Sequence, residues 1–434
     1  MKQRPVSVHV TTMGCSKNLV DSEVLMGWLR AAGYKVIHQD KVQYADIAIV
    51  NTCGFIEDSI TENINQILEI IKAKENGLVD KVYVMGCLVQ RFKDDLRHAI
   101  PEVDHFYGVD EIGLILKDLG VDYRHELTGE RMISTPSHYA YLKISEGCDR
   151  NCAFCTIPAI RGKNKSKSIE EICDEAASLA SKGVKEIILI AQDITRYGVD
   201  VYGKKQLPKL LRELDKVEGI YWIRLQYTYP DNVLYEIIDL MKNSSKLCHY
   251  LDIPLQHIDS EILKSMNRGH SRDNIMDILQ QFREEIPDIA IRTTFITGYP
   301  GETEEKYSQL KDFIQSFRFD RLGVFPFSPE KGTAAADLNS QVPMEVRQKR
   351  AEEIMVLQQG IARSLNHNKI GDILTAIVDR KEGDSWVLRS QYDSPEVDTE
   401  IFVAEDQNLT QGHFYQVKII SAEDYDLNGS VLEA

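Results

Sequence analysis

The sequence contains no run of about 20 apolar residues, the length needed to span a bilayer. Its first residues, MKQRPVSVHV, also lack the basic stretch and long apolar run of an export signal. Both absences argue against an exported or membrane-embedded protein, so we expect a cytoplasmic one. With 43% hydrophobic and 27% charged residues, the composition is that of a globular protein.

The sequence also has fewer basic than acidic residues: it contains 51 Lys and Arg and 67 Asp and Glu, which gives a formal net charge of −16. Phosphate binding depends on Lys and Arg displacing counterions, so this balance argues against broad attraction to nucleic acid. A basic partner fits it better. The alternative is that the negative charge serves only solubility.

The length of 434 residues predicts two to four domains. Over the first 125 residues, β-rich runs alternate with helical patterns, which is typical of βαβ units on a parallel, Rossmann-like sheet. The predicted strands are Val6–Thr12, Ile47–Asn51 and Val82–Met85, and the predicted helices are Ser22–Ala32 and Ser59–Lys74. A polar stretch from about Leu127 to Ser137 is predicted to be a linker.

Six further strands alternate with amphipathic helical patterns in the middle of the chain. No seventh or eighth repeat follows, so the pattern predicts an incomplete (β/α)6 barrel that is open on one side. The strands expected are Tyr141–Ile144, Glu186–Ala191, Trp222–Gln226, Tyr250–Pro254, Ile291–Ile296 and Leu322–Pro326. An open side can admit a large substrate.

The last part of the chain changes character after a helical stretch at Pro343–His367. Short strands with turn residues follow, in ILTAIV, SWVLRS, TEIFVA and FYQVKII, and predict a small all-β barrel or sandwich. We therefore expect domains at 1–126, 137–367 and 368–434. Residues 369–434 hold five Lys and Arg against fourteen Asp and Glu, a formal charge of −9.

Eight cysteines in a reducing compartment are poor candidates for structural disulfides, so their spacing must indicate their use. Cys148, Cys152 and Cys155 form a CxxxCxxC run directly after the first barrel strand. Three thiolates in one loop can bind three irons of a [4Fe–4S] cluster and leave the fourth iron open to S-adenosylmethionine, SAM. A zinc site is the alternative, but no fourth Cys or His follows nearby.

Three more cysteines, Cys15, Cys53 and Cys87, each lie just past the carboxyl end of a predicted N-terminal strand. Ligands gather at this edge of open α/β sheets, so these thiols are expected to converge in space. The alternative is that each is a small buried apolar residue. Cys173 and Cys248 are assigned to packing, because one lies in a helical apolar pattern and the other stands alone.

Four segments together resemble a known family: MGCSKNLVDSE, NTCGFIEDS, VMGCLVQR and YLKISEGCDRNCAFCTIPAIRG. They are similar to the methylthiotransferases of the radical SAM superfamily, and the likeness extends over the whole chain to a C-terminal TRAM-type barrel. The resemblance implies two [4Fe–4S] clusters, an auxiliary one on Cys15, Cys53 and Cys87 and a SAM-binding one on Cys148, Cys152 and Cys155. One SAM would methylate a sulfur on the auxiliary cluster, and a second would yield the radical.

The phrase GCSKNLVDSE is similar to the branch that modifies the β-carbon of an aspartate in small-subunit ribosomal protein twelve. The acidic C-terminal part supports a basic protein substrate and disfavours tRNA. A tRNA adenosine methylthiotransferase is the alternative in the same class, and a noncatalytic zinc protein is the alternative outside it. The resemblance also implies an electron donor such as flavodoxin or ferredoxin.

The carboxyl ends of barrel strands carry active sites, so polar residues there are candidate SAM contacts. We expect Gln192 or Asp193 near SAM, and Gly298 in TGYPGETEE resembles the family's strand end beside the adenosine; a plain turn is the alternative. Arg161 could pair with a SAM carboxylate or with the substrate aspartate, or form only a loop salt bridge. His257 is assigned no chemical role.

Overall fold

The computed structural model describes residues 4–39, 41–42, 44–121, 131–405 and 407–432. The chain divides into two compact units. The first unit comprises 1–135, 146–150 and 155–165, and the second comprises 136–145, 151–154 and 166–434. The beginning of the predicted linker and the predicted boundary at 126 lie outside the described residues, and the three-domain division stays a prediction.

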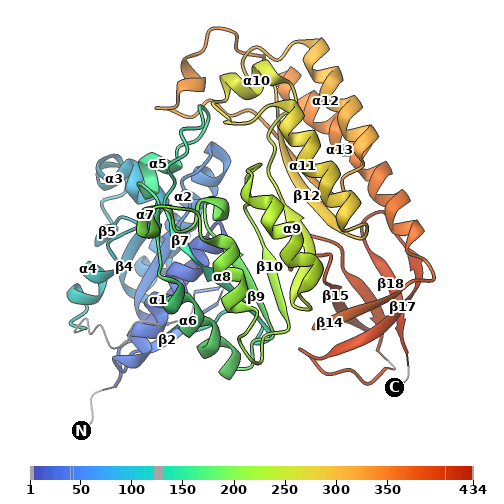
Figure 1. Ribbon diagram of the computed structural model, residues 1–434. Helices are drawn as coiled ribbons and strands as arrows, with labels where there is room; N and C mark the ends of the chain where they lie inside the picture. The colour runs from blue at the N-terminus through green and yellow to red at the C-terminus, as the bar shows by residue number, and fades with distance from the viewer. Residues whose placement is uncertain (1–3, 40, 43, 122–130, 406, 433–434) are drawn as a thin grey trace. The chain divides into compact units, whose positions relative to one another are not determined.

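The first unit contains a five-stranded parallel sheet in the order β2-β1-β3-β4-β5 (Figure 1). Its strands are β1 (Ser7–Thr12), β2 (Lys35–His38), β3 (Ala45–Thr52), β4 (Val79–Gly86) and β5 (His105–Tyr107). Its helices are α1 (Ser16–Ala31), α2 (Glu57–Glu75), α3 (Cys87–Ala99), α4 (Ile112–Asp118) and α5 (Ile157–Arg161). The parallel sheet predicted for this part of the chain is confirmed.

Apolar side chains cover both faces of this sheet, as parallel sheets require. On one face, Val50 and Val84 pack with Ile67 of α2 and Leu88 of α3. A second cluster, which includes Leu25 of α1 and Ile115 of α4, covers the other face. The core therefore lies in two layers, and the carboxyl ends of the strands are left for polar and sulfur-bearing residues.

The second unit holds a six-stranded parallel sheet in the order β13-β12-β11-β10-β9-β6. Its strands are β6 (Tyr139–Lys143), β9 (Glu186–Ile190), β10 (Trp222–Leu225), β11 (Leu247–Asp252), β12 (Ala290–Thr297) and β13 (Arg321–Pro326). All six predicted strands are present, and β6 and β13 are its two edges. The incomplete barrel expected from the sequence is confirmed.

Helices connect these strands, as the amphipathic patterns predicted (Figure 1). They are α6 (Ile169–Ser181), α7 (Val199–Tyr202), α8 (Leu207–Leu214), α9 (Val233–Asn243), α10 (Ser260–Ser265), α11 (Arg272–Glu285) and α12 (Glu304–Phe317), with the 3-10 turns η2 (Ile194–Arg196) and η3 (Ala334–Asp337). Two short strands, β7 (Ser145–Glu146) and β8 (Lys165–Ser166), pair in a separate two-stranded sheet. The long helix α13 (Met344–Asn368) follows β13 and η3.

A closed five-stranded barrel ends the chain, in the order β14-β15-β16-β18-β17. Its strands are β14 (Ile373–Glu382), β15 (Ser385–Ser390), β16 (Ile401–Ala404), β17 (Phe414–Ala422) and β18 (Leu427–Val431). Inward-facing residues such as Val378, Leu388 and Val417 fill its interior. Closure removes the exposed strand edges that a small open sheet would leave.

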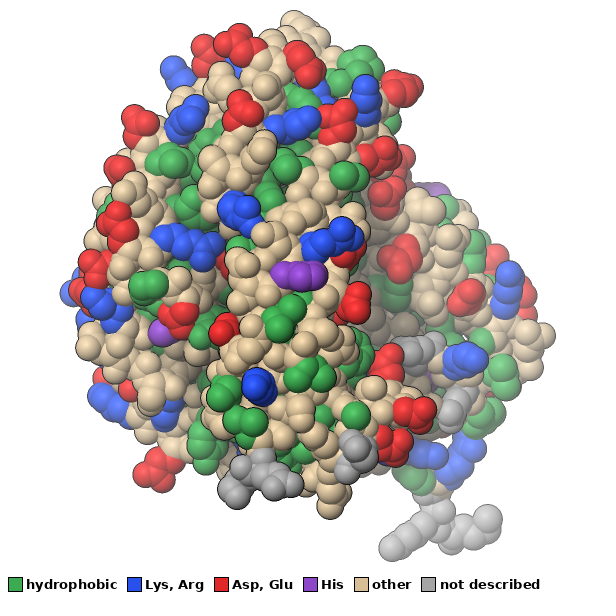
Figure 2. Space-filling model, turned by 90° about the vertical axis from the view of Figure 1, so that its right-hand side faces the viewer, with side chains coloured by type: hydrophobic (Ala, Val, Ile, Leu, Met, Phe, Trp, Pro, Cys, Tyr) green, Lys and Arg blue, Asp and Glu red, His purple; other side chains and the backbone are tan. Residues whose placement is uncertain are grey.

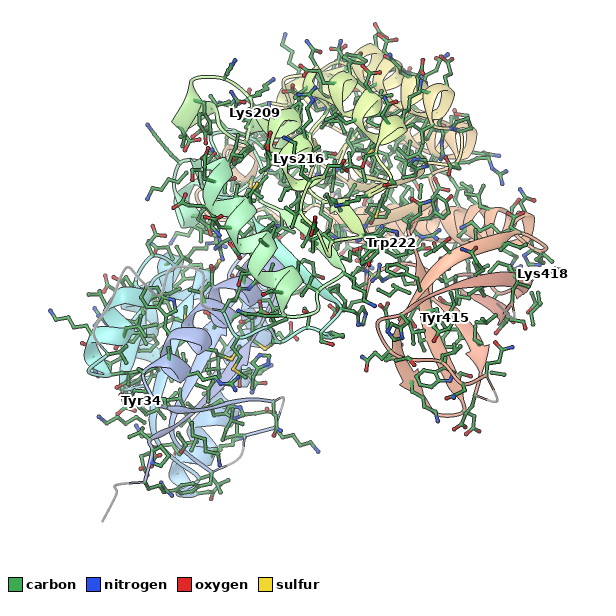
Figure 3. All side chains as sticks on the ribbon, turned by 60° about the horizontal axis from the view of Figure 1, so that its bottom comes forward. Tyr34, Lys209, Lys216, Trp222, Tyr415 and Lys418 are labelled. Carbon is green, nitrogen blue, oxygen red and sulfur yellow. The ribbon has the colours of Figure 1, made fainter. Side chains whose placement is uncertain are left out.

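Within the second unit, the barrel packs against the amino-terminal ends of the sheet strands. Trp222 begins β10 and lies beside the barrel (Figure 3), where its ring meets that of Phe414 with centroids 4.8 Å apart. Ile377 joins Trp222 and Tyr250 in one apolar cluster. The barrel therefore covers the end of the sheet opposite to the one where parallel strands carry their ligands.

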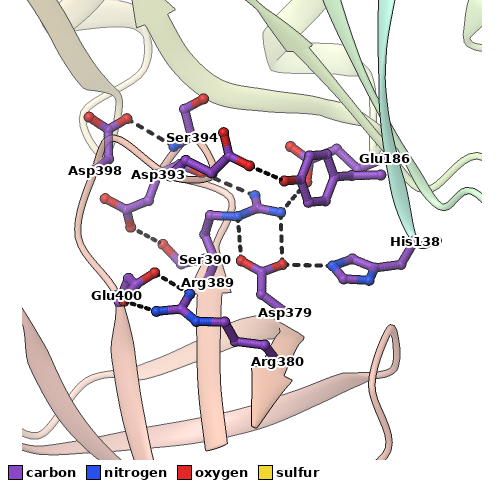
Figure 4. Close-up of polar contacts among 12 residues, drawn as sticks. His138, Glu186, Asp379, Arg380, Arg389, Ser390, Asp393, Ser394, Asp398 and Glu400 are labelled. Carbon is purple, nitrogen blue, oxygen red and sulfur yellow. Dashed lines mark hydrogen bonds and ion pairs between the residues drawn. The ribbon is translucent and has the colours of Figure 1, made fainter. Parts of the chain in front are cut away.

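A buried ionic network reinforces this contact (Figure 4). Arg389 of the barrel donates to Asp379 at 2.9 Å and pairs with Glu186 of β9 at 2.6 Å, and its side chain is 1% exposed. Glu186 also accepts from Arg224 at 2.7 Å, and Asp379 contacts His138 at 2.8 Å. Buried charges need such partners to offset their lost hydration.

Candidate functional site

Cys15, Cys53 and Cys87 follow three neighbouring strands of the first sheet. Cys15 precedes α1 after β1, Cys53 comes directly after β3, and Cys87 is the first residue of α3 after β4. Because β1 pairs with β3 and β3 pairs with β4, the three cysteines leave the sheet at the same edge. Their exposure is graded: Cys15 is exposed, Cys53 is half-buried and Cys87 is buried.

The loops that carry these cysteines approach one another closely. A Cβ added to Gly14, the neighbour of Cys15, would lie 2.6 Å from the Cβ of Cys53. A Cβ added to Gly86, the neighbour of Cys87, would lie 2.5 Å from the carbonyl oxygen of Thr52. Each contact leaves no room for a side chain, so glycine is what allows the loops to converge.

Asn18 of α1 ties the three strand ends together. Its Nδ2 donates to the carbonyl of Met13 at 3.0 Å and to that of Thr52 at 3.1 Å. Its Oδ1 lies 3.7 Å from the Sγ of Cys87. One buried amide thus contacts the chain at the end of each cysteine-bearing strand, and fixes their spacing.

Burial raises the pKa of two of these thiols. It raises the pKa of Cys53, and it raises the pKa of Cys87 to about 11, although the nearby Arg161 guanidinium opposes both shifts. The other two thiols of the group also raise the pKa of Cys87, because like charges disfavour each other. Binding of a metal or a cluster would require these thiols to lose their protons.

Arg161 of α5 lies at the centre of this group, with a side chain only 2% exposed. Its Nε donates to the Sγ of Cys87 at 3.4 Å, and its Nη2 donates to the Oδ1 of Asn18. Its Nη1 pairs with Glu146 at 2.8 Å and with Asp21 at 3.2 Å. Although burial lowers its pKa, these two carboxylates outweigh burial and hold the pKa above its usual value.

All three guanidinium nitrogens of Arg161 are therefore engaged inside the first unit. Of the roles considered for Arg161, the structure provides the salt bridge, and adds the contact with Cys87. A SAM carboxylate or a substrate aspartate would have to displace these partners.

Cys148, Cys152 and Cys155 lie in the loop between β7 and α5. The backbone N–H of Cys148 donates to the carbonyl of Gly162 at 3.0 Å, and the N–H of Arg150 points to the Sγ of Cys148 at 3.4 Å. The three thiols are all half-buried. Closure of the loop at its base keeps them in one short segment with their sulfurs partly accessible.

Arg268, which the sequence pattern did not single out, approaches Cys152. Its Nη1 lies 3.7 Å from the Sγ, its Nη2 donates to the carbonyl of Pro254 at 2.6 Å, and its guanidinium stacks over Tyr229 at 4.1 Å. Phe154 packs against the apolar cluster of Met266 and Tyr299. Each set of cysteines thus has one arginine donating toward a sulfur.

The predicted SAM contacts at the end of β9 lie where they were expected, at the carboxyl edge of the second sheet. Gln192 is half-buried. The buried carboxylate of Asp193 accepts from the backbone N–H of Thr195 at 2.9 Å and caps η2. Whether either residue contacts SAM stays a prediction.

Gly298, at the end of β12, lies in a buried polar cluster. Its N–H donates to the carboxylate of Glu302 at 3.0 Å, and the side chain of Arg347 packs against its Cα. Glu302 also pairs with Arg350 at 2.7 Å and lies 3.3 Å from the Nε2 of His257. These contacts give TGYPGETEE a structural role as a turn, and an adenosine contact by Gly298 stays a prediction.

The remaining cysteines are packed in the second unit. Cys248 is buried in β11, and Cys173 is half-buried in α6. Among the described residues, no three His, Cys, Asp or Glu side chains are placed to hold a single metal ion. Each cysteine group has three thiols and an arginine N–H donor beside one sulfur, and its role as a set of iron–sulfur ligands stays a prediction.

Sequence reasoning missed Asn18, Asp21, Glu146 and Arg268. Asn18 and Asp21 follow Cys15 by three and six residues and so lie on the same face of α1, which is a signal that helical spacing could have given. Arg268 carries no such local signal, because it reaches Cys152 from a loop more than a hundred residues further along the chain.

Three known families match this chain. The Radical SAM superfamily matches residues 142–314, the Uncharacterized protein family UPF0004 matches 7–108, and the TRAM domain matches 370–432. These segments contain, in turn, the cysteine triad with most of the second sheet, the three N-terminal cysteines, and the closed barrel.

Full-length relatives share about half of their residues with this chain. Proteins named "Ribosomal protein uS12 methylthiotransferase RimO" are 51% identical in Flavobacterium psychrophilum, over 97% of each chain, and 48% identical in Cytophaga hutchinsonii, over 98% of each. The relative of the same name in Bacteroides thetaiotaomicron is 47% identical over 98% of each chain.

Solved structures share the fold at low identity. The radical S-adenosylmethionine methyltransferase TsrM from Kitasatospora setae has a TM-score of 0.55 at 15% identity, over 76% of this chain and 77% of its own. The cobalamin-dependent S-adenosylmethionine radical enzyme OxsB has a TM-score of 0.51 at 14% identity, over 82% of this chain and 56% of its own. These likenesses support the fold.

Proposed function

Because the chain belongs to the radical SAM methylthiotransferase family, we propose that it adds a methylthio group to the β-carbon of an aspartate in small-subunit ribosomal protein uS12. The observation that carries the proposal is the second set of thiols. Cys15, Cys53 and Cys87 leave three adjacent strands at one edge, beside Arg161 and apart in sequence from the triad loop. A SAM radical enzyme that only abstracts hydrogen needs no such set.

We assign two [4Fe–4S] clusters to these residues. Cys148, Cys152 and Cys155 would hold the cluster that binds SAM, and Cys15, Cys53 and Cys87 would hold the auxiliary cluster. When bound, the first would provide with SAM the radical that abstracts hydrogen, and the second would provide the sulfur, with a second SAM as the source of the methyl group.

The protein's own residues position these groups. Asn18 fixes the distance between the three strand ends, and the graded burial of the thiols leaves the Cys15 side accessible to a substrate. On the other side, buried Cys87 and Arg161 exclude water from the group. Arg268 would orient the triad through Cys152, with its own plane held by Tyr229.

The substrate assignment rests on the names of the full-length relatives. The acidic residues of the C-terminal part give this substrate assignment less support than the formal charge of −9 suggested. Asp393 and Asp398 are buried and pair with Arg321 and Arg292 of the second sheet, so their charge is balanced internally. On the face drawn in Figure 2, acidic and basic side chains are interspersed.

The electron donor and the location in the cell remain predictions. No helix among the described residues is both long enough and apolar enough to cross a membrane. A redox protein such as flavodoxin or ferredoxin would serve as the electron donor.

Mass spectrometry of candidate substrates tests the proposed function. The reconstituted protein is incubated anaerobically with SAM and a reductant, and with either ribosomal protein uS12 or tRNA. We expect one methylthio group on an aspartate of uS12, loss of this product with Cys53→Ala, and retention of it with Cys173→Ala, the matched packing cysteine. Modification of tRNA alone would move the chain to the tRNA branch of the family.

A further inference from the structure

The guanidinium of Arg161 connects parts of the first unit that are far apart in sequence. Its Nε reaches the Sγ of Cys87, which begins α3, while its Nη atoms reach Asn18 and Asp21 on α1. The same side chain pairs with Glu146, two residues before Cys148. The group is nearly inaccessible to solvent, with 4% of the residue exposed.

The guanidinium of Arg161 pairs with two carboxylates, and its remaining N–H groups donate to Asn18 and to Cys87. This arrangement costs hydration free energy, and a helix such as α5 could be packed with apolar residues instead. The single contact that a packing role does not require is the one from Nε to the Cys87 sulfur, at 3.4 Å. Hydrogen bonds and positive charge at a cluster's sulfur ligands are known to raise its reduction potential.

We propose that Arg161 is a positioning residue of the auxiliary cluster: its Nε–H donates to the Cys87 thiolate and raises the reduction potential of the cluster bound there. This inference rests on the proposed function, because it requires a cluster on Cys15, Cys53 and Cys87. Asp21 and Glu146 hold the guanidinium plane so that Nε faces the sulfur. Because these two carboxylates neutralise the guanidinium, Arg161 is not available to bind an anion from solution.

The effect of Arg161 on the reduction potential of the auxiliary cluster depends on the loop that carries Cys148. Cys148 N–H binds the carbonyl of Gly162, the residue after Arg161, at 3.0 Å. A Cβ on Gly147 would lie 2.7 Å from the carbonyl oxygen of Arg161 itself, so the two backbone segments are in contact. The loop that carries Cys148 therefore sets where the Arg161 backbone lies, and so where its Nε points.

The experiment isolates the auxiliary cluster. In the full chain, Cys148→Ala, Cys152→Ala and Cys155→Ala remove the triad, and the remaining cluster is titrated electrochemically and followed by electron paramagnetic resonance. Arg161→Lys is added because lysine keeps the positive charge for Asp21 and Glu146 but places a carbon where arginine has Nε. Arg161→Met removes the charge as well.

We expect the midpoint potential to shift to a more negative value in Arg161→Lys, and further in Arg161→Met. Arg97→Lys, an exposed arginine of the same helix as Cys87, is the matched control and should leave the potential unchanged. If Arg161→Met does not fold, Arg161→Lys alone decides the question, because it leaves no buried acid unpaired.

Two results overturn the inference, and they differ. A cluster that is present with an unshifted potential in Arg161→Lys would show that Arg161 serves packing alone, while the proposed function stands. Absence of any cluster from the triad-free chain, with Arg161 intact, would remove both the inference and the auxiliary cluster of the proposed function.

Discussion

Gly86 joins β4 to Cys87 with a backbone φ of +105°, a conformation that side chains disfavour. An added Cβ would also meet Asn51 and Thr52 within 2.5 Å. We expect Gly86→Ala to lower the stability of the apo protein by about 1–3 kcal/mol and to reduce the binding of iron to the first unit. Thermal unfolding and iron analysis measure the two effects.

Gly113 provides the control at the same scale. It lies exposed in α4 with nothing within 4 Å of an added Cβ, and alanine is favoured over glycine in a helix. Gly113→Ala should leave iron binding unchanged, and its unfolding temperature should equal or slightly exceed that of the wild type. Equal stability of both variants would contradict the crowding assigned to Gly86.

Single residues show where sequence reasoning stops. The places of Cys15, Cys53 and Cys87 after strands could be predicted from the sequence, while the role of all six cysteines as cluster ligands stays a prediction. Arg161 could not be placed, because its Cys87 and Asp21 partners lie 74 and 140 residues away and belong to other elements. Local spacing indicates which residues can act, whereas the fold decides which partners they meet.

At the scale of elements, Asp46 joins β1 to β3. Its carboxylate accepts from the hydroxyl and the N–H of Ser7, at 2.7 and 2.6 Å, and these bonds lower the pKa of Asp46 to about 2. A lowered pKa stabilises the fold above the ordinary carboxyl range, and this contribution is lost as the pH falls toward 2. Asp46→Asn should therefore destabilise the apo protein at pH 7 and much less near pH 2.

Urea unfolding at several pH values checks this prediction. The difference in midpoint between wild type and Asp46→Asn should shrink steadily below about pH 4. A difference that stays constant over that range would show that the contact acts through shape and not through charge.

The contact between the barrel strands and the second sheet depends on Arg389. Arg389→Met would leave the buried carboxylates of Asp379 and Glu186 without this partner, which costs about 3–5 kcal/mol. Lys381→Met removes an exposed ion pair with Glu405 in the same barrel and should cost less than about 1 kcal/mol. Thermal unfolding compares them, and similar losses would contradict the importance of burial.

Elements with a strong pattern were predicted, and weakly patterned ones were missed. The six strands of the second sheet are mostly buried apolar runs, and each was placed within a few residues. Five strands were not predicted: β2, whose residues are mostly half-exposed, β5, which has three residues, β7 and β8, which have two residues each, and β18, which reads LNGSV. Pairing with neighbouring strands stabilises these strands, and their sequences lack the alternating apolar pattern that would predict them.

For the whole molecule, net charge was the weakest guide. The formal charge of −9 of residues 369–434 favoured a basic protein substrate, yet part of this charge is balanced by buried ion pairs such as Asp393 with Arg321. A count of charges carries no information about which of them face solvent. The motifs around the cysteines were a better guide, because they indicated the family that the full-length relatives show.

We propose that one chain holds two iron–sulfur clusters on separate sets of cysteines. Iron and sulfide analysis after anaerobic reconstitution tests it most directly, on the wild type and on the variant that lacks Cys148, Cys152 and Cys155. We predict about eight irons per chain in the wild type and about four in the variant. About four irons in the wild type and none in the variant would contradict the claim, because Cys15, Cys53 and Cys87 would then hold no cluster.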